Sequence, residues 1–231
     1  MAKVAQEDGT TKIGITPHLF RLTRYGDDFG LLEERMAGLK GRASRFQVQL
    51  YRGAEVYIRE DIVANLKRHN LTVNGSCYFF VEFPADGMIA GGRDLFYKIM
   101  LEGYIPIISH PERNMVFAQR PELLFELVSM GALAQVTAKS ILGEFGHKTK
   151  ETAELFLKNN LVHLIASDAH DSLWRPPLLS RAVEKAEKIV GKEKARAMVT
   201  AVPQAILDNE QVPEYDRPVH PTKRHKWLNI F

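Results

Sequence analysis

The stretch Ile105-Pro-Ile-Ile-Ser-His-Pro-Glu-Arg113 joins an apolar run, typical of a buried strand, to polar side chains that follow it directly. A helical pattern comes next: Pro121 stands at a first helical position, leucines recur at helical spacing, and Gly131 lies beyond the last turn. A strand followed by a helix is the repeating unit of parallel α/β proteins. We therefore expect this stretch to form one unit of a parallel sheet.

The same alternation runs along the whole chain and favours a largely parallel sheet. Further helices are expected over residues 149–159 and 177–190, and residues 1–8 have the pattern of a helix fragment that ends at Gly9. Barrels of about 200 to 250 residues are routinely single domains, so we expect one domain over residues 1–213 and a basic tail over residues 214–231. The expected strands are residues 13–16, 46–51, 78–83, 105–109, 133–137 and 161–167.

Composition excludes several classes of protein. No apolar run is long enough to span a bilayer and residues 1–9 lack the apolar part of a secretory signal, so we expect a cytoplasmic chain without membrane insertion. The single cysteine, Cys77, cannot form an internal disulfide, and Phe83 stands six positions later, where thiolate phosphatases have an arginine. We expect Cys77 in the core. The net charge of +3 is mild, so we expect a solvated tail and no nucleic-acid binding.

Five of the six expected strands end in, or lead directly into, side chains that can bind a metal ion. Because parallel strands of a barrel end at one face, side chains scattered along the chain should converge there. Asp168 and His170 share a face if their segment is extended, and the proline after His110 should keep that histidine extended. The six candidate ligands are His18, Glu55, Glu82, His110, Asp168 and His170.

A mixture of imidazoles and carboxylates suits Mn, Fe or Zn better than Ca, and bridging carboxylates would allow more than one ion. Taken singly, such a histidine is more often a hydrogen-bonded core residue, and such a glutamate is usually a cap or a salt-bridge partner. The shared position of all six at strand ends favours the metal site. Arg113 and Arg175 lie in loops at the same face, where guanidinium groups could hold phosphate oxygens or form surface salt bridges.

These motifs resemble the CpsB/CapC type of manganese-dependent protein-tyrosine phosphatases, within the PHP superfamily. The resemblance covers nearly the whole chain. It implies a distorted (β/α)7-type barrel, up to three Mn²⁺ or other divalent ions, and phosphotyrosine on a bacterial tyrosine kinase of capsule or exopolysaccharide assembly as substrate. It also implies that the six candidates are metal ligands and that Arg113 and Arg175 clamp phosphate. The motifs are Thr16-Pro-His18, Gly53-Ala-Glu55, Val81-Glu-Phe-Pro84, His110-Pro-Glu-Arg113, Ser167-Asp-Ala-His170 and Arg175-Pro-Pro177.

The family opens with a strand that bears a His-x-His pair and, shortly after, an aspartate, and this sequence contains none of these ligands. We therefore expect a barrel lacking its first strand, with fewer metal ions and low or no activity. In an intact enzyme the metals would acidify the attacking water, Arg113 and Arg175 would neutralise the phosphoryl oxygens, and a protonated His18 or His170 could assist the leaving group.

Two alternatives remain open. One is another PHP phosphoesterase that acts on histidinol phosphate or a nucleotide, and the other is a catalytically silent remnant that binds a kinase tail or a sugar phosphate. A substrate panel separates the first from a tyrosine phosphatase, and binding without turnover identifies the second.

Overall fold

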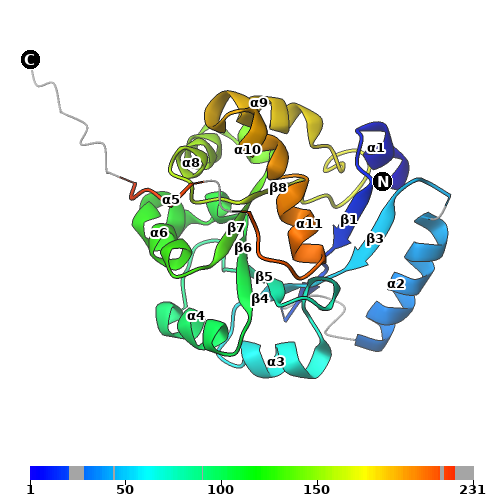
Figure 1. Cartoon of the computed structure of the whole chain (residues 1–231), viewed down its shortest axis with the longest axis horizontal. Coiled ribbons are helices and arrows are strands. Elements are labelled where there is room, and N and C mark those ends of the chain that lie inside the picture. The colour runs from blue at the N-terminus through cyan, green and yellow to red at the C-terminus, as the bar shows by residue number, and fades with distance from the viewer. Residues whose placement is uncertain (21–28, 44, 90, 214–215, 222–231) are drawn as a thin grey trace, which may run out of the picture.

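The computed structural model describes residues 1–20, 29–43, 45–89, 91–213 and 216–221, and Figure 1 shows the whole chain. In chain order the elements are α1 (Ala2–Glu7), β1 (Lys12–Ile15), β2 (His18–Leu19), α2 (Phe29–Ala43), β3 (Gln49–Arg52), β4 (Glu55–Tyr57), α3 (Ile62–His69), η1 (Val73–Gly75), β5 (Tyr78–Glu82), α4 (Gly92–Leu101), β6 (Ile105–Ser109), η2 (Pro111–Arg113), α5 (Met115–Gln119), α6 (Pro121–Ser129), β7 (Leu133–Thr137), α7 (Ala138–Leu142), α8 (His147–Lys158), β8 (Leu164–Ala166), α9 (Ser180–Val190), α10 (Lys192–Ala197) and α11 (Ala201–Leu207).

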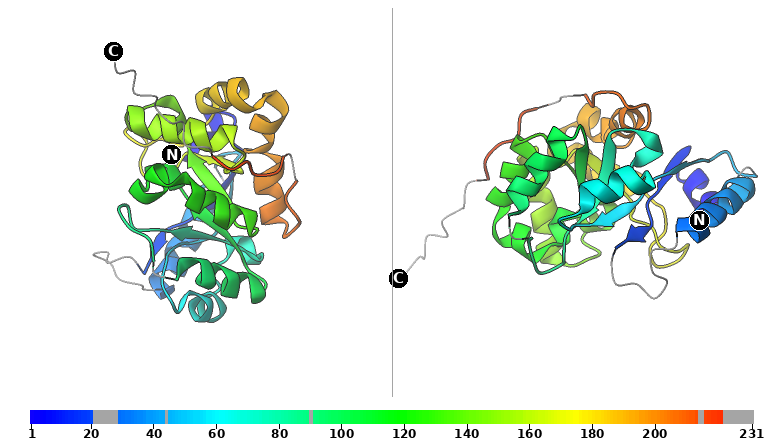
Figure 2. Two further views of the ribbon diagram at one scale, coloured as in Figure 1. Left: turned by 90° about the vertical axis from the view of Figure 1, so that its left-hand side faces the viewer. Right: turned by 90° about the horizontal axis from the view of Figure 1, so that it is seen from below.

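Six strands form one sheet in the order β2-β4-β5-β6-β7-β8, and each adjacent pair is parallel. Neighbours in this sheet follow one another along the chain, as successive βα units produce. Helices surround the strands in the perpendicular views of Figure 2. The predicted α/β fold with parallel strands is confirmed.

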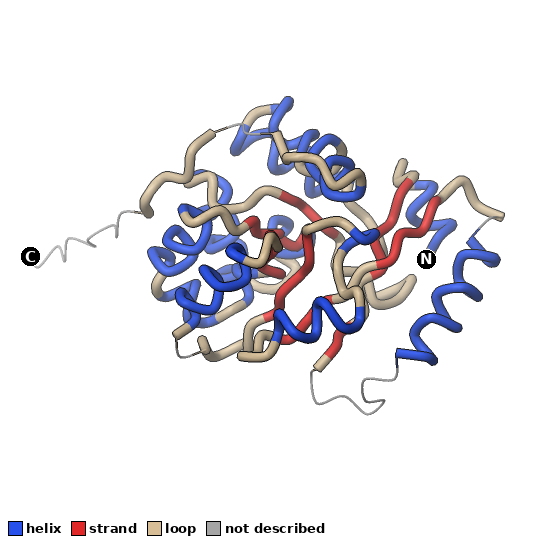
Figure 3. The backbone as a smooth tube through the Cα atoms, turned by 60° about the horizontal axis from the view of Figure 1, so that its bottom comes forward, coloured by secondary structure: helices blue, strands red, loops and turns tan. Residues whose placement is uncertain are grey.

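The first strand pair is interrupted halfway. β1 pairs with β3 as a separate two-stranded sheet, and β2 pairs with β4 in the main one. Between them Gly53 N donates to Ile15 O at 2.9 Å and Glu55 N donates to Pro17 O at 2.9 Å. Pro17 has no N–H to give in return, so the ladder breaks there. Figure 3 shows β1 and β3 on the side of the molecule that also carries α1 and α2.

Some predicted boundaries are displaced, for local reasons. The predicted strand over 161–167 is reduced to β8, because Leu161 N still donates to Phe156 O at 2.9 Å and closes the end of α8. The helix predicted from residue 177 begins at Ser180, where the side chain of Asp8 receives the N–H groups of Leu179 and Ser180. The helix predicted over 149–159 begins two residues earlier, at His147.

The core lies between the main sheet and its surrounding helices. Phe79, Phe96, Phe117 and Phe156 are fully buried in it. The ring of His163 faces the interior: its Nδ1 accepts from Ala134 N at 3.1 Å, and burial lowers its pKa to about 4. Cys77, expected in the core, is only half-buried at the margin of a second apolar cluster.

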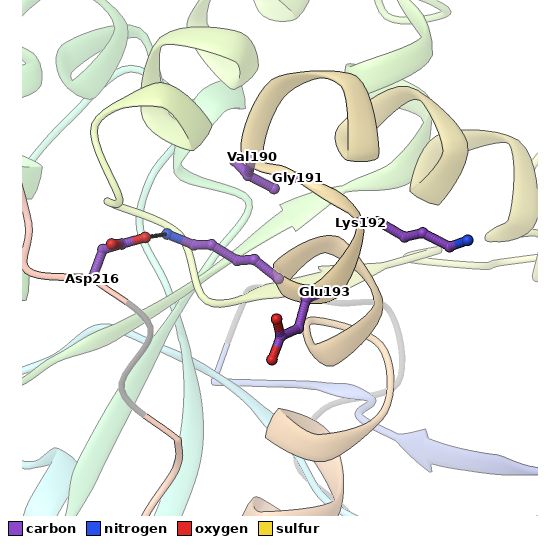
Figure 4. Close-up of a pocket in the computed structure, with 6 residues that line it drawn as sticks. Val190, Gly191, Lys192, Glu193 and Asp216 are labelled. Atoms are coloured by element: carbon purple, nitrogen blue, oxygen red, sulfur yellow. Dashed lines mark hydrogen bonds and ion pairs between the residues drawn. The ribbon is translucent and has the colours of Figure 1, made fainter.

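Most of residues 216–221 are exposed to solvent, but they are also attached to the domain. Val219 N donates to Asn159 O at 2.8 Å, and Lys194 Nζ pairs with Asp216 at 3.0 Å. Figure 4 shows that ion pair beside a shallow depression at the turn between α9 and α10. Within the described residues, no helix is long and apolar enough to cross a membrane.

Candidate metal and phosphate site

Four of the predicted site residues meet where neighbouring strands β2, β4, β5 and β6 lie side by side. His18 Nδ1 lies 3.1 Å from Glu55 Oε2 and 3.3 Å from Glu82 Oε2. On the other side, His110 Nε2 lies 3.1 Å from Glu55 Oε1 and 3.8 Å from Glu82 Oε1. The two carboxylates, 6% and 5% exposed, are therefore shared between two imidazoles.

The charges of these side chains are set by one another. Contact with Glu55, and next with Glu82, raises the pKa of His18 from 6.5 to about 10. Burial raises the pKa of Glu55, but the opposing effects of His110 and His18 are larger together and hold that pKa well below its usual value. Burial lowers the pKa of His110, and Glu55 more than compensates, so that the pKa is raised. Glu55 is thus held in its ionised form beside a protonated His18.

The donor set fits a transition-metal ion. His18, Glu55 and Glu82 each present one ligand atom, and these three atoms lie within 4.8 Å of one another. One imidazole nitrogen with two carboxylate oxygens suits Mn, Fe or Zn. A metal ion in this place would compensate the buried carboxylates, a role that the proton on His18 otherwise performs.

Asp168 lies beside both predicted phosphate-binding arginines. Arg113 Nη1 donates to Asp168 Oδ2 at 2.6 Å, and Arg175 Nη2 donates to the same oxygen. The ring of Phe145 lies under both guanidinium groups, with its centroid 5.0 Å from Cζ of Arg113 and 5.8 Å from Cζ of Arg175. The role of Asp168 as a metal ligand stays a prediction, since its carboxylate here faces the two arginines.

His170 connects the two groups of side chains. Its Nδ1 lies 3.0 Å from Asp168 O, and its ring centroid lies 6.0 Å from that of His18. His18 belongs to β2 and His170 follows β8, which stand at opposite ends of the strand order, so the sheet curves strongly. All eight predicted site residues therefore surround one mouth of the sheet.

Two local expectations at this mouth are wrong. His110 is not extended: it has φ 36° and ψ 51°, in the left-handed region. The chain must turn at once from β6 into η2, and because the right-handed region is disfavoured before proline, a left-handed residue makes the turn. Asp168 also has φ 49°, so Asp168 and His170 do not lie along an extended segment. Such strained residues cluster at functional sites.

Two site residues were missed from the sequence. Glu112 is 2% exposed, and its Oε1 accepts from Thr137 N at 3.0 Å and from Ser140 Oγ at 2.6 Å, which ties η2 to α7. The second is Phe145, in a loop between Gly143 and Gly146, both with positive φ. An aromatic residue between two glycines before a helix was the available signal for it.

The fold and the site together define a parallel α/β protein with a mixed imidazole and carboxylate donor set beside two arginines. The family described as "Capsular polysaccharide synthesis, CpsB/CapC" matches residues 1–208. The chain belongs to the CpsB/CapC family, as its motifs predicted.

Individual relatives extend this result. The chain is similar to the tyrosine-protein phosphatase YwqE of Bacillus subtilis, with 33% identity over 234 residues that cover 100% of this chain and 91% of YwqE. It is 30% identical over 175 residues to the tyrosine-protein phosphatase CpsB of Streptococcus agalactiae, covering 73% of this chain and 72% of CpsB.

A solved structure also matches. It belongs to the work described as "Crystal structures of YwqE from Bacillus subtilis and CpsB from Streptococcus pneumoniae, unique metal-dependent tyrosine phosphatases". The TM-score is 0.88 at 32% identity, and the match covers 97% of this chain and 90% of that chain.

Proposed function

We propose that this chain is a metal-dependent protein-tyrosine phosphatase. The observation that carries the proposal is the position of the His18, Glu55 and Glu82 donor set, whose two carboxylates are buried, in the same mouth as two arginines that already hold a carboxylate. Relatives named tyrosine-protein phosphatases, and a structural neighbour described as metal-dependent, support it.

His18, Glu55 and Glu82 would hold the ion, with His110 and Asp168 as proposed further ligands and Mn²⁺ as the proposed metal. We assign His170 to proton transfer and not to the metal, because Nε2 cannot bind an ion and carry a proton at once. When bound, such an ion acidifies water and neutralises phosphoryl charge. Arg113 and Arg175 both donate to Asp168 Oδ2, so two guanidinium groups point at one anionic oxygen. A phosphoryl group that reaches this place would receive the same donors, which match its oxygens in charge and geometry.

His170 is the proposed proton donor to the leaving phenolate. A carbonyl oxygen can only accept, so the contact between Asp168 O and His170 Nδ1 puts the hydrogen on Nδ1. Nε2 is then free to take up a proton from water, which gives an imidazolium, and to pass that proton to the phenolate oxygen as the bond to phosphorus breaks. His18 is less suited, because its Nδ1 already faces Glu55 and Glu82.

The proposed physiological substrate is a tyrosine-phosphorylated protein, specifically a bacterial tyrosine kinase that regulates capsule or exopolysaccharide assembly in the cytoplasm. The family's description as capsular polysaccharide synthesis supports this assignment.

The test is hydrolysis by the purified chain of a phosphotyrosine peptide, a phosphoserine peptide and histidinol phosphate, each with Mn²⁺ and with a chelator. In keeping with the low activity expected from the sequence, we expect slow release of phosphate from the phosphotyrosine peptide that needs Mn²⁺ and is lost in the double variant Glu55→Gln and Glu82→Gln. Glu102→Gln is the control, because Glu102 pairs with Lys67 in an exposed ion pair. Preference for histidinol phosphate would assign a different phosphoesterase, and peptide binding without turnover would assign a silent binding protein.

A further inference from the structure

Two exposed apolar side chains occupy the loop that connects two site residues. Leu173 and Trp174 are each 82% exposed and lie between His170 and Arg175. Among the described large hydrophobic residues that are exposed, the next values are 69% for Leu101 and 58% for Tyr97, both on α4. Single exposed apolar side chains are ordinary, whereas a pair beside a functional site indicates an interaction surface.

The loop holds these side chains outward by its own hydrogen bonds. Asp171 Oδ1 accepts from Leu173 N at 2.7 Å and from Trp174 N at 2.6 Å, and His170 N donates to Arg175 O at 3.0 Å. Lys139 Nζ, on α7, donates to Trp174 O at 2.5 Å. The backbone from 170 to 175 is thus a closed turn attached to α7. The exposure of Leu173 and Trp174 is a consequence of this turn.

The position of the loop indicates what would cover the two side chains. Trp174 directly precedes Arg175 in the chain. If Arg175 holds the phosphoryl group, the residues of a substrate that flank the phosphotyrosine come close to Trp174. The other arginine has a similar neighbour, since Met115, two residues after Arg113, is 56% exposed. A small phosphate ester is too short to cover these side chains, whereas a polypeptide has residues on both sides of the phosphotyrosine.

We propose that Leu173 and Trp174 form a docking surface for apolar residues that flank the phosphotyrosine of a polypeptide substrate. The proposal rests on the proposed phosphatase function. Tryptophan is among the residue types that dominate binding energy at interfaces, because its large rigid ring loses little conformational freedom. An apolar flank is the matching chemistry, because it covers an indole and a leucine side chain without leaving polar groups unsatisfied.

The experiment compares the double variant Leu173→Ala and Trp174→Ala with the double variant Tyr97→Ala and Leu101→Ala. The control pair is similarly exposed but lies on α4, with Leu101 at the helix end that leads to the amino end of β6, away from the site. The substrates are a phosphotyrosine peptide with leucine and phenylalanine flanks, the same peptide with glycine and serine flanks, and p-nitrophenyl phosphate.

For the loop variant, we expect the ratio of kcat/KM for the apolar-flank peptide to kcat/KM for p-nitrophenyl phosphate to fall about tenfold. The preference for apolar over glycine and serine flanks should fall with it, and both ratios should stay within about twofold in the α4 variant. An equal loss on all three substrates, or no change in either ratio, would overturn the docking surface.

A chain that hydrolyses none of the three substrates contradicts the proposed function instead. The docking surface is then measured by the Kd of the apolar-flank phosphopeptide relative to that of free phosphotyrosine. We expect about tenfold tighter binding of the peptide, lost in the loop variant. Equal Kd values for parent and loop variant would overturn the proposal without any reference to turnover.

Discussion

At the scale of the residue, His18 carries a charge that a metal ion must displace. Its pKa of about 10, raised by Glu55 and Glu82, keeps the imidazole protonated at neutral pH in the metal-free chain. A histidine binds a metal ion through a neutral imidazole, so binding of the ion to His18 releases a proton. Proton release therefore couples the affinity for metal to pH.

We expect the affinity of the chain for Mn²⁺ to rise about tenfold per pH unit between pH 6 and 8, because one proton leaves His18 for each ion bound at the His18, Glu55 and Glu82 site. Calorimetric titration in buffers of different ionisation enthalpy measures the number of protons released. In His18→Ala the remaining affinity should be weaker and its pH dependence smaller. An affinity that does not change with pH in the parent chain would contradict this coupling.

Phe145 is a positioning residue for the two arginines, since its ring lies under both guanidinium groups at 5.0 Å and 5.8 Å. Phe145→Leu keeps an apolar side chain but removes the cation–π attraction, worth about 0.5 to 1 kcal/mol for each exposed contact. We expect inhibition by inorganic phosphate to weaken and KM to rise, each by about fivefold, with a smaller change in kcat.

The matched control for that variant is Phe125→Leu, because Phe125 packs against the ring of His220 on another part of the surface. Its kinetic constants should equal those of the parent. If the phosphate inhibition constant of Phe145→Leu also stayed at the parent value, Phe145 would have no part in phosphate binding.

At the scale of the element, α9 receives its cap from a residue 171 positions earlier. Leu179 and Ser180 donate their N–H groups to Asp8 Oδ2 at 2.6 Å and 3.1 Å, and Ser180 Oγ contacts the other oxygen of the same carboxylate. These hydrogen bonds of Asp8 join the end of α1 to the C-terminal part of the fold. It also supplies an anion to the positive end of the α9 dipole.

We expect Asp8→Ala to lower the free energy of unfolding by about 1 kcal/mol, the usual loss when a helix cap is removed. The urea midpoint should fall while the denaturant slope stays constant. Glu7→Ala is the control, because Glu7 forms an exposed ion pair with Lys3 at 3.8 Å on α1. Equal midpoints for the two variants would show that the Asp8 cap contributes nothing.

The type of most elements could be predicted from the sequence, because strand and helix periodicities are local. β5, β6, β7 and α6 lie close to their predicted ranges. The features that could not be predicted depend on residues distant in the sequence, or on backbone conformations that are rare for the residue type. The start of α9 depends on Asp8, and the turn after β6 needs a left-handed histidine. The break between β1 and β2 follows from Pro17, whose effect depends on its partner strand.

The candidate site also has one part that could be predicted from the sequence and one part that could not. The convergence of His18, Glu55, Glu82 and His110 could be predicted, because it requires only that parallel strands end at one face. The pairing of Asp168 with Arg113 and Arg175 could not, because it depends on two loops and on Phe145 beneath them. The partners of side chains in loops are determined by tertiary packing, and tertiary packing produces no periodic pattern of residues in the sequence.

At the scale of the whole molecule, the stability of the metal-free chain should depend on pH through the His18 and Glu55 pair. Glu55 has a lowered pKa, so its stabilisation is present above its usual pKa of 4.5 and is lost as pH falls toward the folded value. His18 has a raised pKa, so its stabilisation is present below 6.5 and is lost as pH rises through about 10.

We expect the melting temperature of the chain in chelator to be highest between about pH 5 and 7 and to fall on both sides. Thermal unfolding from pH 4 to pH 10 measures this. In Glu55→Gln the decline on the alkaline side should be smaller, because His18 loses its strongest partner. Added Mn²⁺ should raise the melting temperature most at the alkaline end, since the neutral imidazole then binds the ion. A flat profile in chelator would contradict the assigned charges.

The curvature of the sheet determines when the site can form during synthesis. His18 and His170 lie 152 positions apart in the chain, yet their rings are 6.0 Å apart in the fold. At a translation rate of about 5 to 20 residues per second, the ribosome needs about 8 to 30 seconds to make the second histidine after the first. During that time His18 and the other ligands made early must remain without His170, which has not yet been synthesised. A nascent chain therefore gains the complete mouth only when its last quarter leaves the ribosome.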